Sequence, residues 1–390
     1  MLPNYMLKSL AAAAALLGAS RATSCDKLDE LDELPELREL CKTPGLYELH
    51  ILAGQRVVYS YSSTEPPEHL LRLTEAGLVG GIILFSENIG PNTKQTVDAF
   101  KEAYRKSPAP RVLKSKTHLK GQARFMVMMD QEGGKVRRIK DQEPKRSAKE
   151  IGASSDPAAE GAKAGAGAAA TLLTYGCNVN LAPVLDIYRQ PGDFTDFYQR
   201  SFGNTSDQVA RAAVPFIAAQ QARGVAACAK HFPGLGAAPH DANTDARPVV
   251  LNQTLCDIRT VDEAPYKEAI RAGVALVMFS WAVYSAVDDK PAGLSKFWGD
   301  ELRRKLRFEG VTVTDALEAG SLDAYGGFGE RAVAATAAGV ELIITSGRDP
   351  TQGEEARNGI VGAVQNGTLD RGAFDDSTKR IALMRSNIAR

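Results

Sequence analysis

Short apolar runs alternate with longer amphipathic segments along most of the chain. The apolar runs carry nearly continuous hydrophobic sequence, which is typical of buried parallel strands. They lie at residues 56–61, 81–85, 124–129, 178–184, 224–230, 275–279, 310–314 and 340–345. Segments with helical spacing lie between and after them, at residues 68–76, 94–106, 158–174, 206–223, 263–272, 295–306, 330–338, 354–365 and 376–389. Because strands and helices alternate, the pattern predicts a parallel sheet with right-handed crossovers.

The number of strand–helix units predicts the architecture. Eight units over about 340 residues suit a closed barrel with some long loops. We therefore predict an α/β fold, a TIM-type (β/α)₈ barrel, as a single catalytic domain at residues 47–390. A doubly wound open sheet is the competing architecture, and no repeat period indicates a solenoid.

The first 23 residues have the features of a secretory signal peptide. Lys8 precedes an apolar run at residues 10–17, and small residues follow. This run is too short to span a bilayer, so we predict a secreted, extracellular protein; an Ala-rich helix start is the alternative. Residues 24–46 are predicted to form an acidic extension outside the catalytic domain. No other run approaches transmembrane length, so we expect no membrane contact in the mature form.

Composition and charge narrow the class of protein. Hydrophobic residues make up 44% of the chain and charged residues 24%, as in ordinary soluble enzymes. Lys+Arg and Asp+Glu are both 47, so no net field favours nucleic acid or an anionic membrane as a partner. The densest basic run, residues 105–120, contains Pro108 and Pro110, and we interpret it as a solvated loop rather than a nucleic-acid patch.

The five cysteines are scattered and do not form a disulfide scaffold or a set with metal-ligand spacing. Cys177 and Cys228 lie in or beside predicted core strands, where a thiol behaves as a small hydrophobe. In a secreted protein, Cys25 and Cys41 are a possible bridge. We predict no metal.

Polar residues follow several of the predicted strands. Asp130, Asp186, the pair Lys230 and His231, and Asp315 stand at strand ends. The carboxyl ends of all strands of a (β/α)₈ barrel face one mouth, so these side chains are predicted to share a pocket. Lys and His near Asp315 would hold it ionised, as a nucleophile requires. The structural alternatives are a loop cap for Asp315 and buried ion pairs of Lys230 and His231 with Asp130 or Asp186.

Five motifs occur in order on these strand ends. They are DQEGGKVRR at residues 130–138, NLAPVLD at 180–186, RSFG at 200–203, KHFPG at 230–234 and VTDAL at 313–317. Together they resemble glycoside hydrolase family 3, specifically its single-domain β-N-acetylglucosaminidase (β-N-acetylhexosaminidase) branch. The resemblance covers nearly the whole predicted domain.

The resemblance implies a retaining exo-glycoside hydrolase that releases terminal β-linked sugars, N-acetylglucosamine first among them. Asp315 would be the nucleophile that forms the covalent glycosyl-enzyme intermediate. Asp130, Arg200, Lys230 and His231 match positions that bind the hydroxyls of the terminal sugar. The expected partner is a carbohydrate substrate, and no cofactor is expected because two side-chain groups suffice for the chemistry.

The loop after the KHFPG motif departs from the family pattern. The resembled branch carries Asp-Ser-His there, whereas residues 241–243 are Asp-Ala-Asn. Asn243 cannot transfer a proton near neutral pH. We predict that His240 with Asp241, or another Asp of this loop such as Asp245, supplies the acid/base. The chain ends soon after the last predicted helix, so we expect this acid to come from the barrel's own loops or from a partner chain.

Three other functions stay open at this point. A β-glucosidase would use the same groups. A carbohydrate-binding protein could have kept the pocket and lost turnover with the loop His. A phosphate-binding barrel enzyme such as an aldolase could use Lys230 as a Schiff-base lysine, although no Gly-rich phosphate loop is evident. The sequence gives no indication of the oligomeric state.

Overall fold

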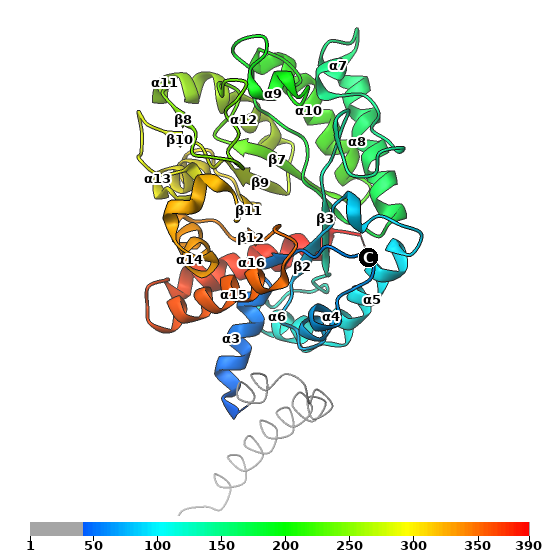
Figure 1. Cartoon of the computed structure of the whole chain (residues 1–390), viewed down its shortest axis with the longest axis vertical. Coiled ribbons are helices and arrows are strands. Elements are labelled where there is room, and N and C mark those ends of the chain that lie inside the picture. The colour runs from blue at the N-terminus through cyan, green and yellow to red at the C-terminus, as the bar shows by residue number, and fades with distance from the viewer. Residues whose placement is uncertain (1–41, 390) are drawn as a thin grey trace, which may run out of the picture.

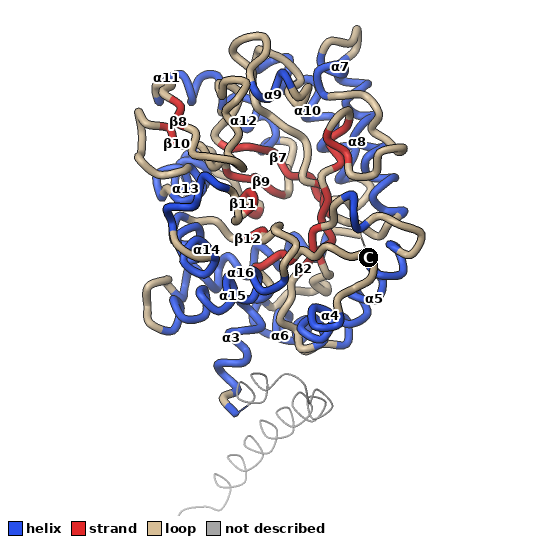
Figure 2. Tube along the Cα trace, viewed as in Figure 1, coloured by secondary structure: helices blue, strands red, loops and turns tan. Residues whose placement is uncertain are grey.

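Eight short strands form a closed parallel barrel in residues 42–389, the part of the chain that the computed structural model describes (Figures 1 and 2). Around the barrel they are β1 (Val57–Tyr59), β2 (Gly81–Ile83), β3 (Met126–Met129), β6 (Val179–Asn180), β7 (Ala226–Phe232), β9 (Leu276–Phe279), β11 (Val311–Ala316) and β12 (Leu342–Ile344). The barrel closes where β1 pairs with β12, in the register Val57↔Ile343. All eight predicted strands and the (β/α)₈ barrel are confirmed, and closure excludes the doubly wound open sheet.

The strands are buried on both faces, which explains why their sequences are largely apolar. In β1, Val58 packs into the apolar cluster inside the barrel, whereas Val57 and Tyr59 pack into the cluster between the barrel and its helices. Successive side chains of a strand point to opposite faces, so both faces of a barrel strand must be apolar. The strands are therefore largely apolar up to the mouth. In β11 the buried Thr312 is an exception, and its hydroxyl donates to the Gly339 carbonyl at 2.9 Å.

Helices surround the barrel at the predicted places (Figure 1). They are α4 (Glu68–Glu75), α5 (Thr93–Lys106), α8 (Pro157–Thr174), α10 (Ser206–Gln221), α12 (Ala264–Arg271), α13 (Lys296–Asp300) with its π-helical continuation η4 (Glu301–Lys305), α14 (Phe328–Ala338), α15 (Pro350–Gln365) and α16 (Arg371–Asn387). The backbones of helices α8 and α10 are in direct contact. A Cβ on Gly161 would lie 2.2 Å from the Ala212 carbonyl oxygen, so glycine is required at that contact.

The interpretation of residues 105–120 as a loop was wrong, because α6 (Ala109–Thr117) lies within it. Pro108 precedes this helix and Pro110 occupies its first turn, where a backbone N–H has no helical partner and proline costs nothing. Burial of Ala109 and Leu113 holds α6 against the core. The helix α3 (Pro44–Gly54), which precedes β1, was also absent from the sequence prediction.

Small additional elements collect in the connections that follow strands. They are η1 (Ser86–Asn88), the hairpin β4 (Gln131–Gly133) and β5 (Val136–Arg137), α7 (Ala148–Gly152), α9 (Phe194–Phe197), β8 (Val250–Leu251), α11 (Leu255–Asp257), η2 (Ile258–Asp262), β10 (Val283–Tyr284), η3 (Ala292–Leu294) and η5 (Gly320–Tyr325). Connections of this kind build the carboxyl-terminal face of a (β/α)₈ barrel, where ligands bind. The additional short helices and strands are therefore concentrated at that face.

Several sequence predictions fall partly or wholly outside the described residues. The predicted signal peptide, most of the acidic extension, and Cys25 and Cys41 all lie there. Within the described part, Cys177 and Cys228 are buried free thiols, as predicted, and Cys256 is an exposed one. No helix of the described residues is long and apolar enough to cross a membrane.

One buried carboxyl group is a candidate for pH-dependent stability. Glu263 lies between η2 and α12 and is fully buried, and neither carboxyl oxygen has a hydrogen-bond partner among the described residues. Burial, and after it the nearby Glu301, raises the pKa of Glu263 from 4.5 to about 7. The folded chain thus holds a proton here that the unfolded chain releases.

We expect Glu263→Gln to stabilise the protein at pH 8 and to change little at pH 5. Because the pKa is higher in the folded state, stability from this group is complete below pH 4.5 and is lost as the pH rises toward 7. Gln mimics the protonated acid, so the gain at pH 8 should be roughly 3 kcal/mol, measured by urea unfolding. Glu268→Gln, on the exposed side of α12, should change little at either pH. Equal effects of Glu263→Gln at both pH values would contradict the assignment.

Candidate active site

Polar side chains line a cavity of about 420 Å³ at the carboxyl end of the barrel. Asp130 directly follows β3, Lys230 and His231 belong to β7, and Asp315 belongs to β11. Arg200 joins them from the segment after α9. All five of these predicted site residues lie in the cavity wall, and its volume falls in the range of small-molecule sites.

An extended segment places two acids on the same side. Asp130 and Glu132 flank Gln131, whose side chain points away and exchanges hydrogen bonds with the backbone of Ile139 (3.1 and 3.2 Å). The side chain of Asn180 fixes this segment: its Oδ1 accepts from the Gln131 N–H at 2.9 Å, and its Nδ2 donates to the Gln131 carbonyl at 3.1 Å. The backbone under both acids is therefore held from β6.

Lys230 lies at the centre of a buried ion network. Its Nζ is 2.8 Å from Asp130 Oδ1 and 2.8 Å from Glu132 Oε1. Arg200 binds Glu132 through two hydrogen bonds, of 2.8 and 3.0 Å. Arg138 donates to the other oxygen of Asp130 at 2.8 Å. Two carboxylates and three cations thus hold one another in fixed positions.

The network determines the charge state of its members. Burial alone would raise the pKa of Asp130, but Lys230 and Arg138 outweigh it and hold that pKa well below its usual range. Burial opposes ionisation of Glu132 as well, yet Arg200 and Lys230 lower its pKa to about 2. For Lys230, burial would lower the pKa, and Asp130 with Glu132 raises it above its usual value. All three groups are charged at neutral pH.

Asp186 positions His231. One of its carboxylate oxygens lies 2.8 Å from His231 Nδ1, and the other accepts from the backbone N–H groups of His231 at 3.1 Å and Leu235 at 2.7 Å. A carboxylate only accepts, so Nδ1 carries the proton and Nε2 lies on the side of Arg200, 3.4 Å from its guanidinium. Asp186 therefore holds the ring and the start of the following loop together. The Lys230–His231 peptide bond is cis.

Asp315 and Asp245 bring two further carboxyl groups to the cavity. Asp315 Oδ1 accepts from the Ala316 N–H at 2.8 Å. Asp245 is exposed as a residue, but it lines the cavity, where loss of water around its carboxyl group and, after it, the negative charge of Asp315 raise its pKa to about 6. The raised pKa lets Asp245 keep its proton to a higher pH than an ordinary aspartate does.

Comparison with known proteins identifies the family. The profile described as "Glycosyl hydrolase family 3 N terminal domain" matches residues 53–384. The chain belongs to glycosyl hydrolase family 3. It is 46% identical to an uncharacterized secreted glycosyl hydrolase of Arthroderma benhamiae, over 88% of this chain and 94% of that one. A β-hexosaminidase of Tolumonas auensis is 30% identical over 68% of this chain and 75% of its own.

Solved family 3 structures have the same fold. A β-N-acetylglucosaminidase from a Paenibacillus species superposes with a TM-score of 0.78 at 28% identity, covering 87% of this chain. The chain spans 62% of the length of that enzyme. A β-N-acetylhexosaminidase from Beutenbergia cavernae gives a TM-score of 0.74 at 29% identity and is covered over 98% of its length. The protein is thus an O-glycosyl hydrolase of family 3 built on a TIM barrel.

The loop after β7 places different residues in the cavity of this family 3 hydrolase than the sequence prediction favoured. Asn243 and Asp245 line the cavity, whereas His240 and Asp241 do not. The His240 ring packs edge-on against Phe197, with centroids 4.0 Å apart. Asp241 is exposed and pairs with Arg247 at 2.7 Å. The catalytic role assigned to His240 and Asp241 stays a prediction.

Backbone contacts fix the loop segment that carries Asp245. The Asp245 N–H donates to Asn243 Oδ1 at 3.0 Å, and the Asp245 carbonyl accepts from the Gly320 N–H at 2.8 Å. A Cβ on Gly320 would lie 2.6 Å from the Ala246 carbonyl oxygen, so only glycine permits this approach. The loop after β7 is thereby joined to the connection after β11, the strand that carries Asp315.

Sequence reasoning missed several residues of the cavity region. Glu132 had a local signal, since it lies two positions after Asp130 in an extended segment and so faces the same side. Arg348 and Glu318 had none. The Arg348 guanidinium lies 3.6 Å over the Phe85 ring, and Glu318 accepts from the Ser346 N–H at 3.0 Å. These contacts join loops that are far apart in the sequence, so no local sequence pattern predicts the contacts.

The ion pairs of Lys230 with Asp130 and Glu132 exclude the Schiff-base alternative. An amine must be neutral to attack a carbonyl, and enzymes achieve this by lowering the lysine pKa. Here two carboxylates raise the pKa of Lys230. Lys230 is therefore a fixed hydrogen-bond donor and not a nucleophile. Among the described residues, no group of three His, Cys, Asp or Glu side chains could hold a metal ion.

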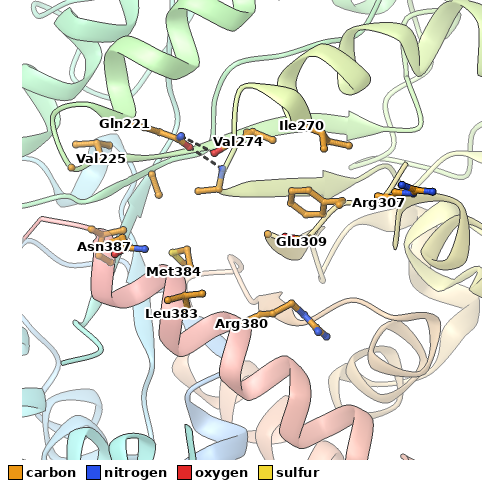
Figure 3. A pocket seen from close by; sticks show the side chains of 17 residues that line it. Gln221, Val225, Ile270, Val274, Arg307, Glu309, Arg380, Leu383, Met384 and Asn387 are labelled. Carbon is orange, nitrogen blue, oxygen red and sulfur yellow. Dashed lines mark hydrogen bonds between the residues drawn. The ribbon is translucent and has the colours of Figure 1, made fainter. Parts of the chain in front are cut away.

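A second cavity, of about 410 Å³, lies at the opposite end of the barrel (Figure 3). Leu383 and Met384 of α16 face it from one side, and the segments that lead into β7, β9 and β11 face it from the other. Gln221 crosses its edge and bonds the backbone of Gly273 and Ala275 at 2.9 and 2.8 Å. None of the strand-end polar residues named above lies in this second cavity.

We expect Glu132→Gln to lower the free energy of unfolding by roughly 3 kcal/mol. The substitution removes one carboxylate from a buried network, so the positive charges of Arg200 and Lys230 lose part of the negative charge that balances them. Urea unfolding at pH 7 measures this. The control is Glu102→Gln, which breaks a bond of similar length, 2.7 Å to Arg105, on the exposed face of α5. That variant should behave like the wild type. Similar losses in both variants would show that burial of the network does not matter.

Proposed function

We propose that this protein is a retaining exo-β-N-acetylhexosaminidase, with Asp315 as nucleophile and Asp245 as acid/base. One observation carries the proposal: two carboxyl groups with different environments line the same cavity as a fixed set of charged hydrogen-bonding groups. Retaining glycosidases need such a pair on the two sides of the scissile bond. The names of related proteins, β-hexosaminidase and β-N-acetylglucosaminidase, support the choice of sugar.

In the first step of this mechanism, Asp315 attacks the anomeric carbon and the bond to the leaving oxygen breaks. Asp245 gives its proton to that oxygen, and the sugar becomes an ester of Asp315. In the second step, Asp245 takes a proton from water, the water oxygen attacks the same carbon, and the Asp315 carboxylate is released. Asp315 must therefore begin ionised and Asp245 protonated.

The buried network would hold the terminal sugar. Asp130 can accept hydrogen bonds from two adjacent hydroxyls, while Lys230, Arg200 and His231 can donate to sugar oxygens. Each of these groups is fixed by partners of its own, so little ordering is needed when the sugar binds. This arrangement agrees with the sugar-binding roles that the sequence predicted.

We prefer Asp245 to His240 as acid/base because Asp245 lines the cavity and its pKa suits a proton donor near pH 6. Asn243, which stands at the position of the missing histidine, is bonded to the backbone of Asp245 and would orient it. We also propose that the protein is secreted, as the name of the Arthroderma relative states of that protein. The segments 1–23 and 24–46 would then be leader and extension to a catalytic domain.

We expect Asp315→Ala to lose activity roughly 10³-fold or more on a nitrophenyl β-N-acetylglucosaminide. Asp245→Asn should lose roughly 10²- to 10⁴-fold on an alkyl glycoside, whose leaving oxygen needs a proton, and far less on a dinitrophenyl glycoside, whose oxygen does not. Added azide should restore turnover of the dinitrophenyl substrate by Asp245→Asn, because azide needs no general base.

His240→Ala is the control for the acid/base assignment and should keep wild-type activity on both substrates. The reverse result, a loss confined to poor leaving groups in His240→Ala, would show that the sequence prediction was right and that Asp245 is not the acid. Faster hydrolysis of the matched β-glucoside would make the protein a β-glucosidase. Binding of amino sugars without hydrolysis of either substrate would make it a carbohydrate-binding protein.

The pH profile gives an independent test. Asp245 must carry a proton to act as acid, and its pKa is raised to about 6. We therefore expect kcat/KM on the alkyl glycoside to fall as the pH rises above about 6. In Asp245→Asn this alkaline decline should disappear. A wild-type rate that stays constant up to pH 8 would contradict the assignment.

A further inference from the structure

Two large aromatic side chains are exposed beside the cavity. Phe197 is 45% exposed and Tyr198 is 40% exposed, and only four large hydrophobic residues of the described chain reach this level. Contiguous exposed aromatic side chains at the edge of a cavity are a candidate binding surface, whereas single exposed apolar side chains are normal. The other two such residues, Val250 and Leu383, lie elsewhere.

The exposed pair belongs to an aromatic cluster that is continuous with the cavity. Phe197 and Tyr198 meet at 5.1 Å between ring centroids, and Tyr198 meets Phe194 at 5.0 Å. Phe194 lines the cavity. The His240 ring also packs against Phe197. We call Phe197, Tyr198 and His240 the rim cluster.

The rim cluster rests on a short segment with a fixed backbone. The Phe194 N–H donates to the Ala238 carbonyl at 2.9 Å, which ties α9 to the loop after β7. Asp196 binds the Gly192 N–H at 2.9 Å and pairs with Lys149 at 2.6 Å. The Lys135 Nζ lies over the Phe197 ring, 5.4 Å from its centroid. The aromatic faces are thus held in place before any ligand arrives, which lowers the entropy cost of binding.

The position of the cluster relative to the proposed acid indicates what would bind there. His240 and Asp245 belong to the same loop, and five residues of chain span at most about 17 Å. If Asp245 protonates the leaving oxygen, the leaving group departs on the side of this loop. The rim cluster therefore borders the space that the leaving group occupies, and not the buried end where the terminal sugar would bind.

We propose that the rim cluster is a subsite for a second sugar, so that the substrate is a β-linked oligosaccharide. The Phe197 and Tyr198 rings are perpendicular, so the apolar C–H face of a pyranose ring would pack on one of them while its edge contacts the other. Lys135 and His240 can donate hydrogen bonds to the hydroxyl or acetamido oxygens of that sugar. This inference rests on the proposed function, because it takes Asp245 to mark the leaving-group side.

The test compares two substrates that share the terminal sugar. One is a β-1,4-linked N-acetylglucosamine disaccharide, and the other is methyl β-N-acetylglucosaminide, which has no second ring. Phe197→Ala combined with Tyr198→Ala should lower kcat/KM on the disaccharide roughly five- to tenfold. It should leave kcat/KM on the methyl glycoside unchanged within twofold. Tyr198→Phe, which keeps the ring, should behave like the wild type.

Leu383→Ala is the matched control, since it removes an exposed hydrophobic side chain, 56% exposed, at the opposite end of the barrel (Figure 3). It should change neither rate. Equal losses of the aromatic double variant on both substrates would show a general role in holding the loop and would overturn the subsite. Unchanged rates on both substrates would overturn it as well.

Failure of the proposed function gives a different result from failure of the subsite. If the wild type hydrolyses neither substrate, the hydrolase assignment fails, and calorimetry then tests the subsite alone. The double variant should bind the disaccharide more weakly than the wild type and should bind N-acetylglucosamine equally well. Equal affinities of the two proteins for the disaccharide would overturn the subsite in that case too.

Discussion

The contact of Lys230 with Asp130 and Glu132 is the interaction on which the rest of the cavity depends. Burying an ammonium group is costly unless its charge is matched at short range, and here two carboxylates match it. Those carboxylates in turn fix Arg138 and Arg200. The polar wall is therefore a single electrostatic unit, and any one of its members is stable in the barrel only because the others are present.

The barrel supplies the geometry that this unit requires. Its strands are largely apolar on both faces until they reach the mouth, and the charged groups begin where the apolar cluster inside the barrel ends. Asn180 and Asp186, from β6 and its connection, hold the segments that carry Asp130 and His231. The acids and cations therefore sit on backbone that is bonded from a neighbouring strand. Preorganisation of this kind is what a site needs in order to bind a polar ligand without first reordering itself.

Much of the fold could be predicted from the sequence, because most barrel strands are largely apolar runs, as Met126–Met129 and Leu276–Phe279 illustrate. The helix α6 could not, since Pro108 and Pro110 suggest a loop unless the position of proline within the first turn is known. The residues of the cavity wall that follow a strand directly were also predictable. Glu132 was overlooked although the two-residue spacing from Asp130 carried the signal.

The path of the loop after β7 lies beyond local sequence rules. His240 and Asp245 are both plausible proton donors as residue types, and which of them faces the barrel depends on contacts with other segments. The His240 ring packs against Phe197 at the rim, and the backbone carbonyl of Asp245 is hydrogen-bonded to Gly320 in the connection after β11. These partners lie 43 and 75 residues from the residues they hold, as the numbering shows (240 − 197 and 320 − 245). Local patterns within one sequence do not reveal such pairs of residues.

The close approach at Gly320 has a stereochemical consequence. Because this glycine bonds the carbonyl of Asp245 and leaves no room for a methyl group, it sets how near the strand of one carboxyl group comes to the loop of the other. In glycosidases, a gap of about 5 Å between two such groups preserves the anomeric configuration of the released sugar, and a gap several ångströms wider inverts it. An alanine at position 320 would place its Cβ 2.6 Å from the Ala246 carbonyl oxygen and push the two segments apart. Under the retaining mechanism proposed above, the configuration of the released sugar would therefore depend on this glycine.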